Sequence, residues 1–289
     1  GRDHAFKDLA IKDPAFKDHF SSVADAYAAA RPEYPDGLFD AIAALVPGIA
    51  RVWEPGCGSG QATRALAARF AHVHATDPSA QQMAQHWASM PLDDRGPGRD
   101  PTGFSQRRVE TPPVHIALAV EPAEHTSLSD ASVQLIAVAQ ALHWFDRPAF
   151  FAECERVLAP GGVLAAWGYP DFIAPEGMIE AVADFRAQIE PHWPPERVQV
   201  DAHYAGYDWP FPAVPGYSPS MSWLEAEWTL PRFLRYLASS SATARCIGET
   251  GDDPVARHAP ALAAAWGDAG DVRTLQWPLF LHLRRKPER

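Results

Sequence analysis

The stretch that decides the fold is Arg51–Leu66, which reads R-V-W-E-P-G-C-G-S-G-Q-A-T-R-A-L. A short apolar lead-in ends at the acid Glu54, and a run of helical composition, Ala62–Phe70, follows the loop. Between them lie three glycines at alternate positions: Gly56, Gly58 and Gly60. Glycines permit positive φ and close backbone approach, and a helix that begins there offers unpaired N–H groups. The stretch therefore predicts the ligand-binding turn of a parallel α/β sheet.

A second acid supports this interpretation. Asp77 ends the next apolar segment, Ala71–Thr76, close to the offset of about 20 residues at which a ribose-binding acid follows a glycine loop. Two alternatives stay open, because such glycine clusters are as often plain turns, and because nicotinamide and flavin loops are also glycine-rich. The dinucleotide pattern G-x-G-x-x-G is not matched, since position 61 is Gln.

The neighbouring segments predict a doubly wound parallel sheet. Further strands are expected at 71–76, 114–120, 132–138 and 163–167, and helices at 38–46, 62–70, 80–88 and 147–158. In the helix at 80–88, Met83 and Trp87 are expected to form the buried stripe, with Ser79 as its cap. Pro160-Gly161-Gly162 is expected to turn the chain before the fifth strand. Strands that alternate with helices imply right-handed crossovers.

The C-terminal third is less regular. Helices are expected at 179–188 and 232–247, and a strand at 274–283 with 222–230 as its antiparallel partner. Pro278 predicts an edge or bulge position for that strand. Four tryptophans suit either a lid over an apolar pocket or ordinary packing of a cap: Trp193, Trp209, Trp223 and Trp228. The segment Pro91–Pro113 is expected to be an inserted surface loop.

Composition narrows the class of partners. The net charge of −11 disfavours a nucleic-acid backbone as ligand. Because no apolar run approaches about 18 residues and no signal peptide is evident, we expect no membrane partner. The three cysteines are far apart and lack metal-ligand spacing, which predicts a reducing, cytoplasmic setting and no metal. A monomer or a homodimer is expected.

Six stretches carry a resemblance to a known family. In chain order they are Y-A-A-A-R-P-E-Y-P (27–35), W-E-P-G-C-G-S-G-Q-A-T (53–63), T-D-P-S (76–79), A-E-H-T-S-L (123–128), A-Q-A-L-H-W-F-D (139–146) and E-R-V-L-A-P-G-G-V-L (155–164). Together they resemble the class I S-adenosylmethionine-dependent methyltransferases, and the first and fifth resemble the small-molecule branch that includes trans-aconitate-type enzymes. The resemblance covers residues from Phe20 to about Tyr169 strongly and the C-terminal third weakly.

The resemblance implies a Rossmann-like, doubly wound, mostly parallel seven-stranded sheet with helices on both faces and a C-terminal helical and aromatic cap. Residues 1–20 would form an N-terminal arm and residues 21–170 the S-adenosylmethionine-binding core. Residues 171–289 would form the cap and the last strands, which complete the sheet.

The resemblance also implies a cofactor, S-adenosyl-L-methionine, with S-adenosyl-L-homocysteine as product. The three glycines would pass under its methionine and ribose part. Glu54, where the family usually has Asp, would face the methionine amino group, and Asp77 would bind the ribose hydroxyls. The other implied cofactor contacts are Pro78 and Ser79 at the adenine, Ala123 and Glu124 at the adenine amine, and Gln140 near the sulfonium.

Two residues before the glycine loop are further candidates. Tyr27 and Arg31 are four residues apart on one expected helix. They would overhang the cofactor cleft, with Arg31 pairing a carboxylate, or they are a packed tyrosine beside a surface arginine.

Catalysis is assigned to the loop that follows the fourth strand. Methyl transfer from a sulfonium is an in-line displacement, so a carboxylate acceptor needs no base, whereas a hydroxyl, an amine or a carbon acid can need one. His143 is expected to contact the substrate or act as base, or else to be a structural histidine, and Trp144 to be an apolar wall. The alternatives to a methyltransferase with a small-molecule acceptor, such as a carboxylic acid, are an S-adenosylmethionine-binding protein without transferase activity and a nicotinamide-dependent enzyme.

Overall fold

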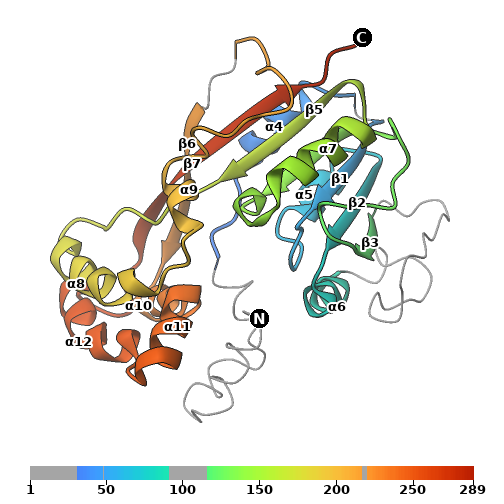
Figure 1. Cartoon of the computed structure of the whole chain (residues 1–289). Coiled ribbons are helices and arrows are strands. Elements are labelled where there is room, and N and C mark those ends of the chain that lie inside the picture. The colour runs from blue at the N-terminus through green and yellow to red at the C-terminus, as the bar shows by residue number, and fades with distance from the viewer. Residues whose placement is uncertain (1–30, 48, 91–115, 217–219) are drawn as a thin grey trace. The chain divides into compact units, whose positions relative to one another are not determined.

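Seven strands form a single sheet in the order β3-β2-β1-β4-β5-β7-β6 (Figure 1). The computed structural model describes residues 31–47, 49–90, 116–216 and 220–289. The strands are β1 (Arg51–Pro55), β2 (His72–Asp77), β3 (Ile116–Val120), β4 (Val133–Ala139), β5 (Leu158–Gly168), β6 (Ser220–Trp228) and β7 (Arg273–Arg285). This mostly parallel, Rossmann-like architecture confirms the predicted fold class.

The strand order reverses beside β1. Strands β2 and β4 flank β1, and both pair with it in parallel. Strand β3 continues in parallel beyond β2, β5 continues in parallel beyond β4, and β7 is antiparallel to β5. In a sheet of this kind the crevice for a ligand opens where the carboxyl ends of β1 and β4 diverge. The glycine loop therefore begins at the switch point of the sheet.

Helices cover both faces of the parallel strands, with α7 in front of the sheet and α4 behind it in Figure 1. The α-helices are α4 (Asp36–Ala43), α5 (Thr63–Ala67), α6 (Ala80–Ser89), α7 (Arg147–Val157), α8 (Ile179–Ile189), α9 (Arg197–Asp201), α10 (Leu230–Ala238), α11 (Ser241–Thr250) and α12 (Pro254–Trp266). Short 3₁₀ helices are η3 (Leu142–Trp144) and η4 (Glu190–His192). Because both faces are covered, β4 is buried from Leu135 to Val138, as its continuous apolar sequence predicts.

The chain divides into two compact units. Of the described residues, the core unit comprises those within 34–47, 49–90, 116–170, 199–216, 220–222 and 279–289, and the helical unit comprises 31–33, 171–198 and 223–278. Within the helical unit, α8, α10 and α11 pack against α12. Across the described ranges, no helix is long and apolar enough to cross a membrane.

The predicted helix at 232–247 is wrong, because the structure contains two helices there. Helix α10 ends before Ser239, and the side chain of Ser240 accepts a hydrogen bond from the Thr243 amide to begin α11. A serine pair inside a helical pattern favours a cap over continuation. Helix α12 was not expected at all. Asp253 caps it by accepting from the amides of Val255 and Ala256.

Two smaller expectations also need correction. Strand β5 begins at Leu158, so Pro160-Gly161-Gly162 lies inside the strand, where the register with β4 shifts, rather than in a turn. Of the two positions predicted for Pro278, an edge strand is wrong, because β7 lies between β5 and β6. The register of β7 with β5 runs from Phe280 to Arg285, so that ladder does not require an N–H from Pro278.

In α6, His86 rather than Trp87 joins Met83 in the buried stripe. The cap that was predicted for this helix is confirmed, because the Ser79 side chain accepts from the Gln82 amide at 3.2 Å. The N-terminal arm, the helix with Tyr27 and the insertion Pro91–Pro113 lie outside the described residues.

Candidate functional site

Glu54, near the end of β1, is a buried acid in which one carboxyl oxygen has no hydrogen-bond partner among the described residues. Its side chain is 1% exposed, and its Oε1 accepts a 2.5 Å hydrogen bond from the Thr63 hydroxyl at the start of α5. Oε2 has no hydrogen-bond partner among the described residues. Burial raises the pKa of Glu54 to about 8. The hydrogen bond from Thr63 lowers the pKa, and the negative charge of Asp77 raises it further. A cationic group that reached Oε2 would satisfy the orphaned atom and ionise the carboxyl.

The three loop glycines all have positive φ, but for different local reasons. A Cβ on Gly56 would lie 2.9 Å from the Ala141 Cβ, and one on Gly60 would lie 2.3 Å from the His86 imidazole. On Gly58 the nearest atom would be 3.9 Å away, in the Gln82 side chain. Gly56 and Gly60 are therefore required by the packing of the protein, whereas Gly58 leaves space for a ligand.

Asp77, the last residue of β2, fixes the glycine loop. Its Oδ2 accepts from the Gly58 amide at 3.1 Å, and its Oδ1 accepts from the Ser79 amide at 2.9 Å. Asp77 and Ser79 are half-buried, and Pro78 between them is exposed. The carboxylate thus stands beside the open position of the loop.

The loop after β3 is organised by a carboxylate that the sequence analysis did not select. Glu121 is 5% exposed and accepts from the Thr126 hydroxyl and the Ser127 amide, with His74 Nε2 3.1 Å from its Oε1. Burial raises the pKa of Glu121, but these hydrogen bonds and the His74 charge outweigh it and lower the pKa to about 2. The predicted Glu124 is half-buried, and its Oε1 accepts from the Asp146 amide at 2.9 Å. Ala123 is packed in the apolar core of the unit, so only its backbone could meet a ligand.

Gln140 follows β4 with a positive φ of 52°. Its side-chain amide forms two hydrogen bonds with the backbone of Tyr169, at 2.7 Å to the N–H and 2.9 Å to the carbonyl. The amide therefore ties the end of β4 to the end of β5. A cofactor contact by this side chain would have to share an amide that already has two partners.

His143 and Trp144 lie together on η3, just after β4. Their ring centroids are 4.4 Å apart, and the two side chains differ sharply in exposure, at 6% for His143 and 40% for Trp144. His143 Nδ1 is 3.0 Å from the hydroxyl of Tyr204, which is itself 1% exposed. Sequence reasoning did not select Tyr204, because nothing in its aromatic-rich segment distinguishes it from its neighbours.

Arg31, the other candidate before the loop, is half-buried in the helical unit. Its assignment to the cofactor remains a prediction, as does that of Tyr27.

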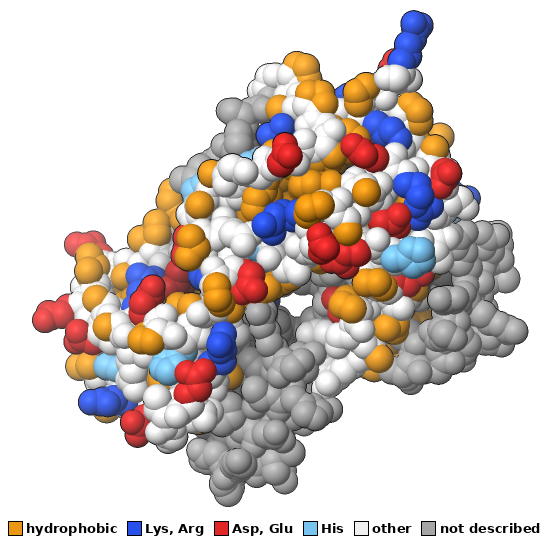
Figure 2. Space-filling view, in the orientation of Figure 1, with side chains coloured by type: hydrophobic (Ala, Val, Ile, Leu, Met, Phe, Trp, Pro, Cys, Tyr) orange, Lys and Arg blue, Asp and Glu red, His pale blue; other side chains and the backbone are white. Residues whose placement is uncertain are grey.

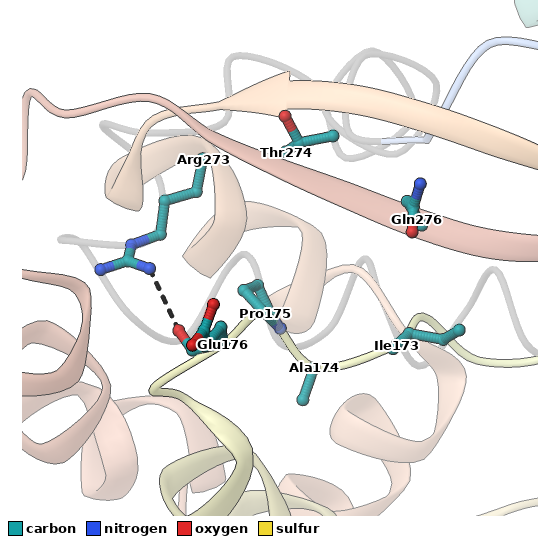
Figure 3. Close-up of a pocket in the computed structure, with 7 residues that line it drawn as sticks. All are labelled: Ile173, Ala174, Pro175, Glu176, Arg273, Thr274 and Gln276. Atoms are coloured by element: carbon teal, nitrogen blue, oxygen red, sulfur yellow. Dashed lines mark hydrogen bonds between the residues drawn. The ribbon is translucent and has the colours of Figure 1, made fainter.

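The helical unit contains a hollow of about 400 Å³ beside β7 (Figure 3). Arg273 is its only basic lining residue, and the guanidinium donates to the Glu176 carbonyl at 3.2 Å and to the Trp266 carbonyl at 2.8 Å. Because the Arg273 guanidinium already donates to these two carbonyls, we interpret the hollow as a recess at the end of α12 and not as a site for an anion. On the face in Figure 2, the described Lys and Arg side chains are scattered among Asp and Glu rather than gathered in a basic field.

Comparisons with known proteins agree with this geometry. The methyltransferase domain family matches residues 53–166. A solved structure from Anaeromyxobacter dehalogenans, assigned as a type II methyltransferase, is 35% identical; the match covers 89% of this chain and 99% of that one, with a TM-score of 0.72.

The matches to two curated relatives cover a smaller share of the chain. One assigned as a methyltransferase in Dictyostelium discoideum is 30% identical over 65% of each chain, and an uncharacterized methyltransferase of Mycobacterium tuberculosis is 34% identical over 53% of each. The chain thus spans between half and two thirds of the length of these relatives.

The buried Glu54 oxygen, the Asp77 carboxylate and the open side of Gly58 suit a ligand that carries an ammonium and a ribose. S-adenosylmethionine, the cofactor of this family, has both groups, so the residues present fit it. The Rossmann-like sheet, the glycine loop and the related proteins all indicate the same family. The chain belongs to the class I S-adenosylmethionine-dependent methyltransferases.

Proposed function

We propose that this protein transfers a methyl group from S-adenosylmethionine to a small-molecule acceptor. The observation that carries the proposal is the fully buried Glu54 carboxyl, whose Oε2 lacks a partner in the described part of the chain at the mouth of the glycine loop. A protein that used this loop only as a turn would gain nothing from an acid held there at the cost of a raised pKa.

The cofactor supplies an electrophilic methyl group on a sulfonium with a neutral leaving group. The residues of the chain bind and orient it. Glu54 would accept from the ammonium, Asp77 would accept from the ribose hydroxyls while it holds the Gly58 amide, and Gly58 would leave the space. Ser79, Pro78 and Glu124 are assigned to the adenine end. None of these residues needs to exchange a proton with the methyl acceptor.

The acceptor is proposed to be small and to carry a carboxylate. His143 and Trp144 follow β4 on the same edge of the sheet as the glycine loop, with a polar ring beside a 40% exposed indole. A polar contact next to an apolar wall is typical of a small-molecule pocket. The net charge of −11 and the scattered basic residues give no support to a polyanionic substrate.

Calorimetric titration of the purified chain with S-adenosylmethionine, S-adenosylhomocysteine and NADH tests the first step. Binding of the first two, weakened by Asp77→Ala, is expected, and binding of NADH alone would overturn the assignment. The second step uses S-adenosylmethionine with a labelled methyl group and panels of small carboxylic acids, phenols and amines. Cofactor binding without transfer to any of these panels would favour a binding protein without transferase activity.

A further inference from the structure

A cluster of two sulfur atoms and one nitrogen joins the glycine loop to α6 within the core unit. Cys57 of the loop is 7% exposed, and its Sγ lies 3.5 Å from the Sδ of Met83 and 3.6 Å from the Nδ1 of His86. Met83 and His86 are three residues apart on the buried side of α6, at 0% and 1% exposed. Two different donor atoms of one helix therefore meet a single thiol.

Apolar packing alone does not explain the imidazole in this cluster. Within the described part of the chain, the Nε2 of His86 has no hydrogen-bond partner, and its Nδ1 faces a thiol, which is a weak hydrogen-bonding group. A buried polar atom without a partner costs about 1–3 kcal/mol. An aliphatic side chain beside the loop would fill the space without that cost, so we looked for a ligand that the nitrogen serves.

The spacing of the donor atoms suits a small cation. Metal bonds of about 2.3 Å to sulfur and about 2.0 Å to nitrogen place the ligand atoms of a three-coordinate centre roughly 3.7 to 4.0 Å apart. The separations from the Cys57 Sγ, 3.5 Å to Met83 and 3.6 Å to His86, differ from this by about half an ångström or less. Small movements of the side chains would therefore admit the cation.

The chemistry of the three donors selects the kind of cation. Thiolate and thioether sulfurs are soft ligands that favour Cu(I), whereas hard cations prefer carboxylate and carbonyl oxygens. Across the described ranges, no group of three or more His, Cys, Asp and Glu side chains is arranged to hold a metal, so the thioether of Met83 has to complete the set. Zn²⁺ is bound by Cys, His, Asp and Glu, and would find only two such ligands here.

We propose that Cys57, Met83 and His86 form a three-coordinate site for Cu(I). The cation forms a bond to Sγ as the thiol loses its proton to solvent, Sδ and Nδ1 complete the coordination, and no electron is transferred. Burial raises the pKa of the Cys57 thiol well above its ordinary value, and the nearby acids Glu54 and Asp77 raise it further, so binding releases a proton at neutral pH.

This inference goes beyond the proposed function, because the site needs neither a cofactor nor a methyl acceptor. The sequence predicted no metal because its cysteines are far apart. The site instead joins Cys57 to a methionine and a histidine that lie 26 and 29 residues further along the chain.

Titration of the reduced full chain with Cu(I), without oxygen and in competition with the chromogenic chelator bicinchoninate, tests the site. About one Cu(I) per chain should bind and release about one proton. Cys57→Ala should abolish this binding. Met83→Leu, which keeps the apolar volume but lacks the sulfur, and His86→Gln should each weaken it by at least about tenfold. Zn²⁺ should bind the wild type far more weakly than Cu(I) does.

Cys154→Ala is the matched control and should bind Cu(I) as the wild type does, because Cys154 is another fully buried cysteine of the core unit, on α7. Circular dichroism identifies the variants that fold, and Met83→Leu decides the test if Cys57→Ala does not. No binding of Cu(I), wild-type affinity in folded Met83→Leu or His86→Gln, or Zn²⁺ binding as tight as that of Cu(I) would overturn the proposal. None of these measurements contains S-adenosylmethionine, so their failure leaves the proposed function untouched.

Discussion

Replacing Glu54 by Gln should stabilise the protein at neutral pH and weaken cofactor binding. The carboxyl is 1% exposed, and burial holds its pKa at about 8 against the usual 4.5. At pH 7 the folded chain therefore keeps Glu54 protonated, while the unfolded chain has it ionised. Gln has the shape of the protonated acid and can still accept from Thr63, but it has no ionised form for the unfolded chain to favour.

The magnitude follows from the pKa difference. A raised folded-state pKa means that the stability is fully present below pH 4.5 and falls as the pH rises to about 8, by about 1.4 kcal/mol for each pH unit. By pH 7 the wild type should have lost about 3 kcal/mol relative to Glu54→Gln. His86 opposes this trend, because burial lowers its pKa from 6.5 to about 4, so its contribution rises with pH but is complete by pH 6.5. Between pH 6.5 and 8 the slope belongs to Glu54.

Urea unfolding of the wild type, Glu54→Gln and Glu155→Gln across pH 5 to 8 tests this. Glu155 is an exposed acid on α7 and serves as the matched control. The free energy of unfolding should fall above pH 6.5 in the wild type and the control, and stay level in Glu54→Gln. S-adenosylmethionine should bind Glu54→Gln about ten- to a hundredfold more weakly, because an ionic hydrogen bond is lost. A flat wild-type profile above pH 6.5, or a Glu54→Gln variant with the wild-type slope, would refute the reasoning.

Three further predictions concern the framework around the cofactor. Gly60→Ala should cost about 3 kcal/mol of stability because its Cβ would overlap the His86 ring, and adding His86→Ala should recover part of this loss. Gly58→Ala, at a φ of 55° and with open space for a Cβ, should cost about 1 kcal/mol and mainly reduce cofactor affinity; urea unfolding and calorimetry measure the two effects. Glu121→Gln should remove roughly 2 kcal/mol above pH 4.5 and flatten the loss of stability that the wild type shows as pH falls from 4.5 towards 2; an unchanged acid profile would reject this role. Gln140→Ala should lower the melting temperature by several degrees, because the hydrogen bonds of Gln140 to the Tyr169 backbone, which join the ends of β4 and β5, are lost. Weaker cofactor binding with an unchanged melting temperature would instead favour direct contact between Gln140 and the cofactor.

The positions of the five parallel strands and their doubly wound arrangement could be predicted because each strand carries its own signal. Apolar runs of strand length, separated by helical periodicity, leave few topologies once crossovers are right-handed. The same logic failed for 232–247, where the helical pattern continues across Ser239 and Ser240 although the cap divides it. Helix α12 was missed although its alanine-rich sequence favours a helix, because Pro254 and Pro260 interrupt the segment and a proline inside a pattern normally indicates that a helix ends.

The residues of the glycine loop could be found from sequence, but their separate roles could not. Three glycines at alternate positions look equivalent in the sequence. Their difference depends on Ala141 and His86, which lie 85 and 26 residues further along the chain. Glu121, in contrast, did have a signal. It follows an apolar strand as Asp77 does, and an acid at the end of a parallel strand is a candidate by the same rule.

The histidine shows most clearly why a site residue is not yet a mechanism. From sequence, His143 after the fourth strand could be a base, a contact or a structural residue, because the pattern places the side chain without placing its protons. The structure adds a neighbour that the local pattern does not reveal, because His143 Nδ1 lies 3.0 Å from the hydroxyl of Tyr204, 61 residues further along the chain. His203 and Tyr204 both have positive φ and pack against Phe280, so the contact with His143 depends on tertiary packing that no local sequence pattern encodes.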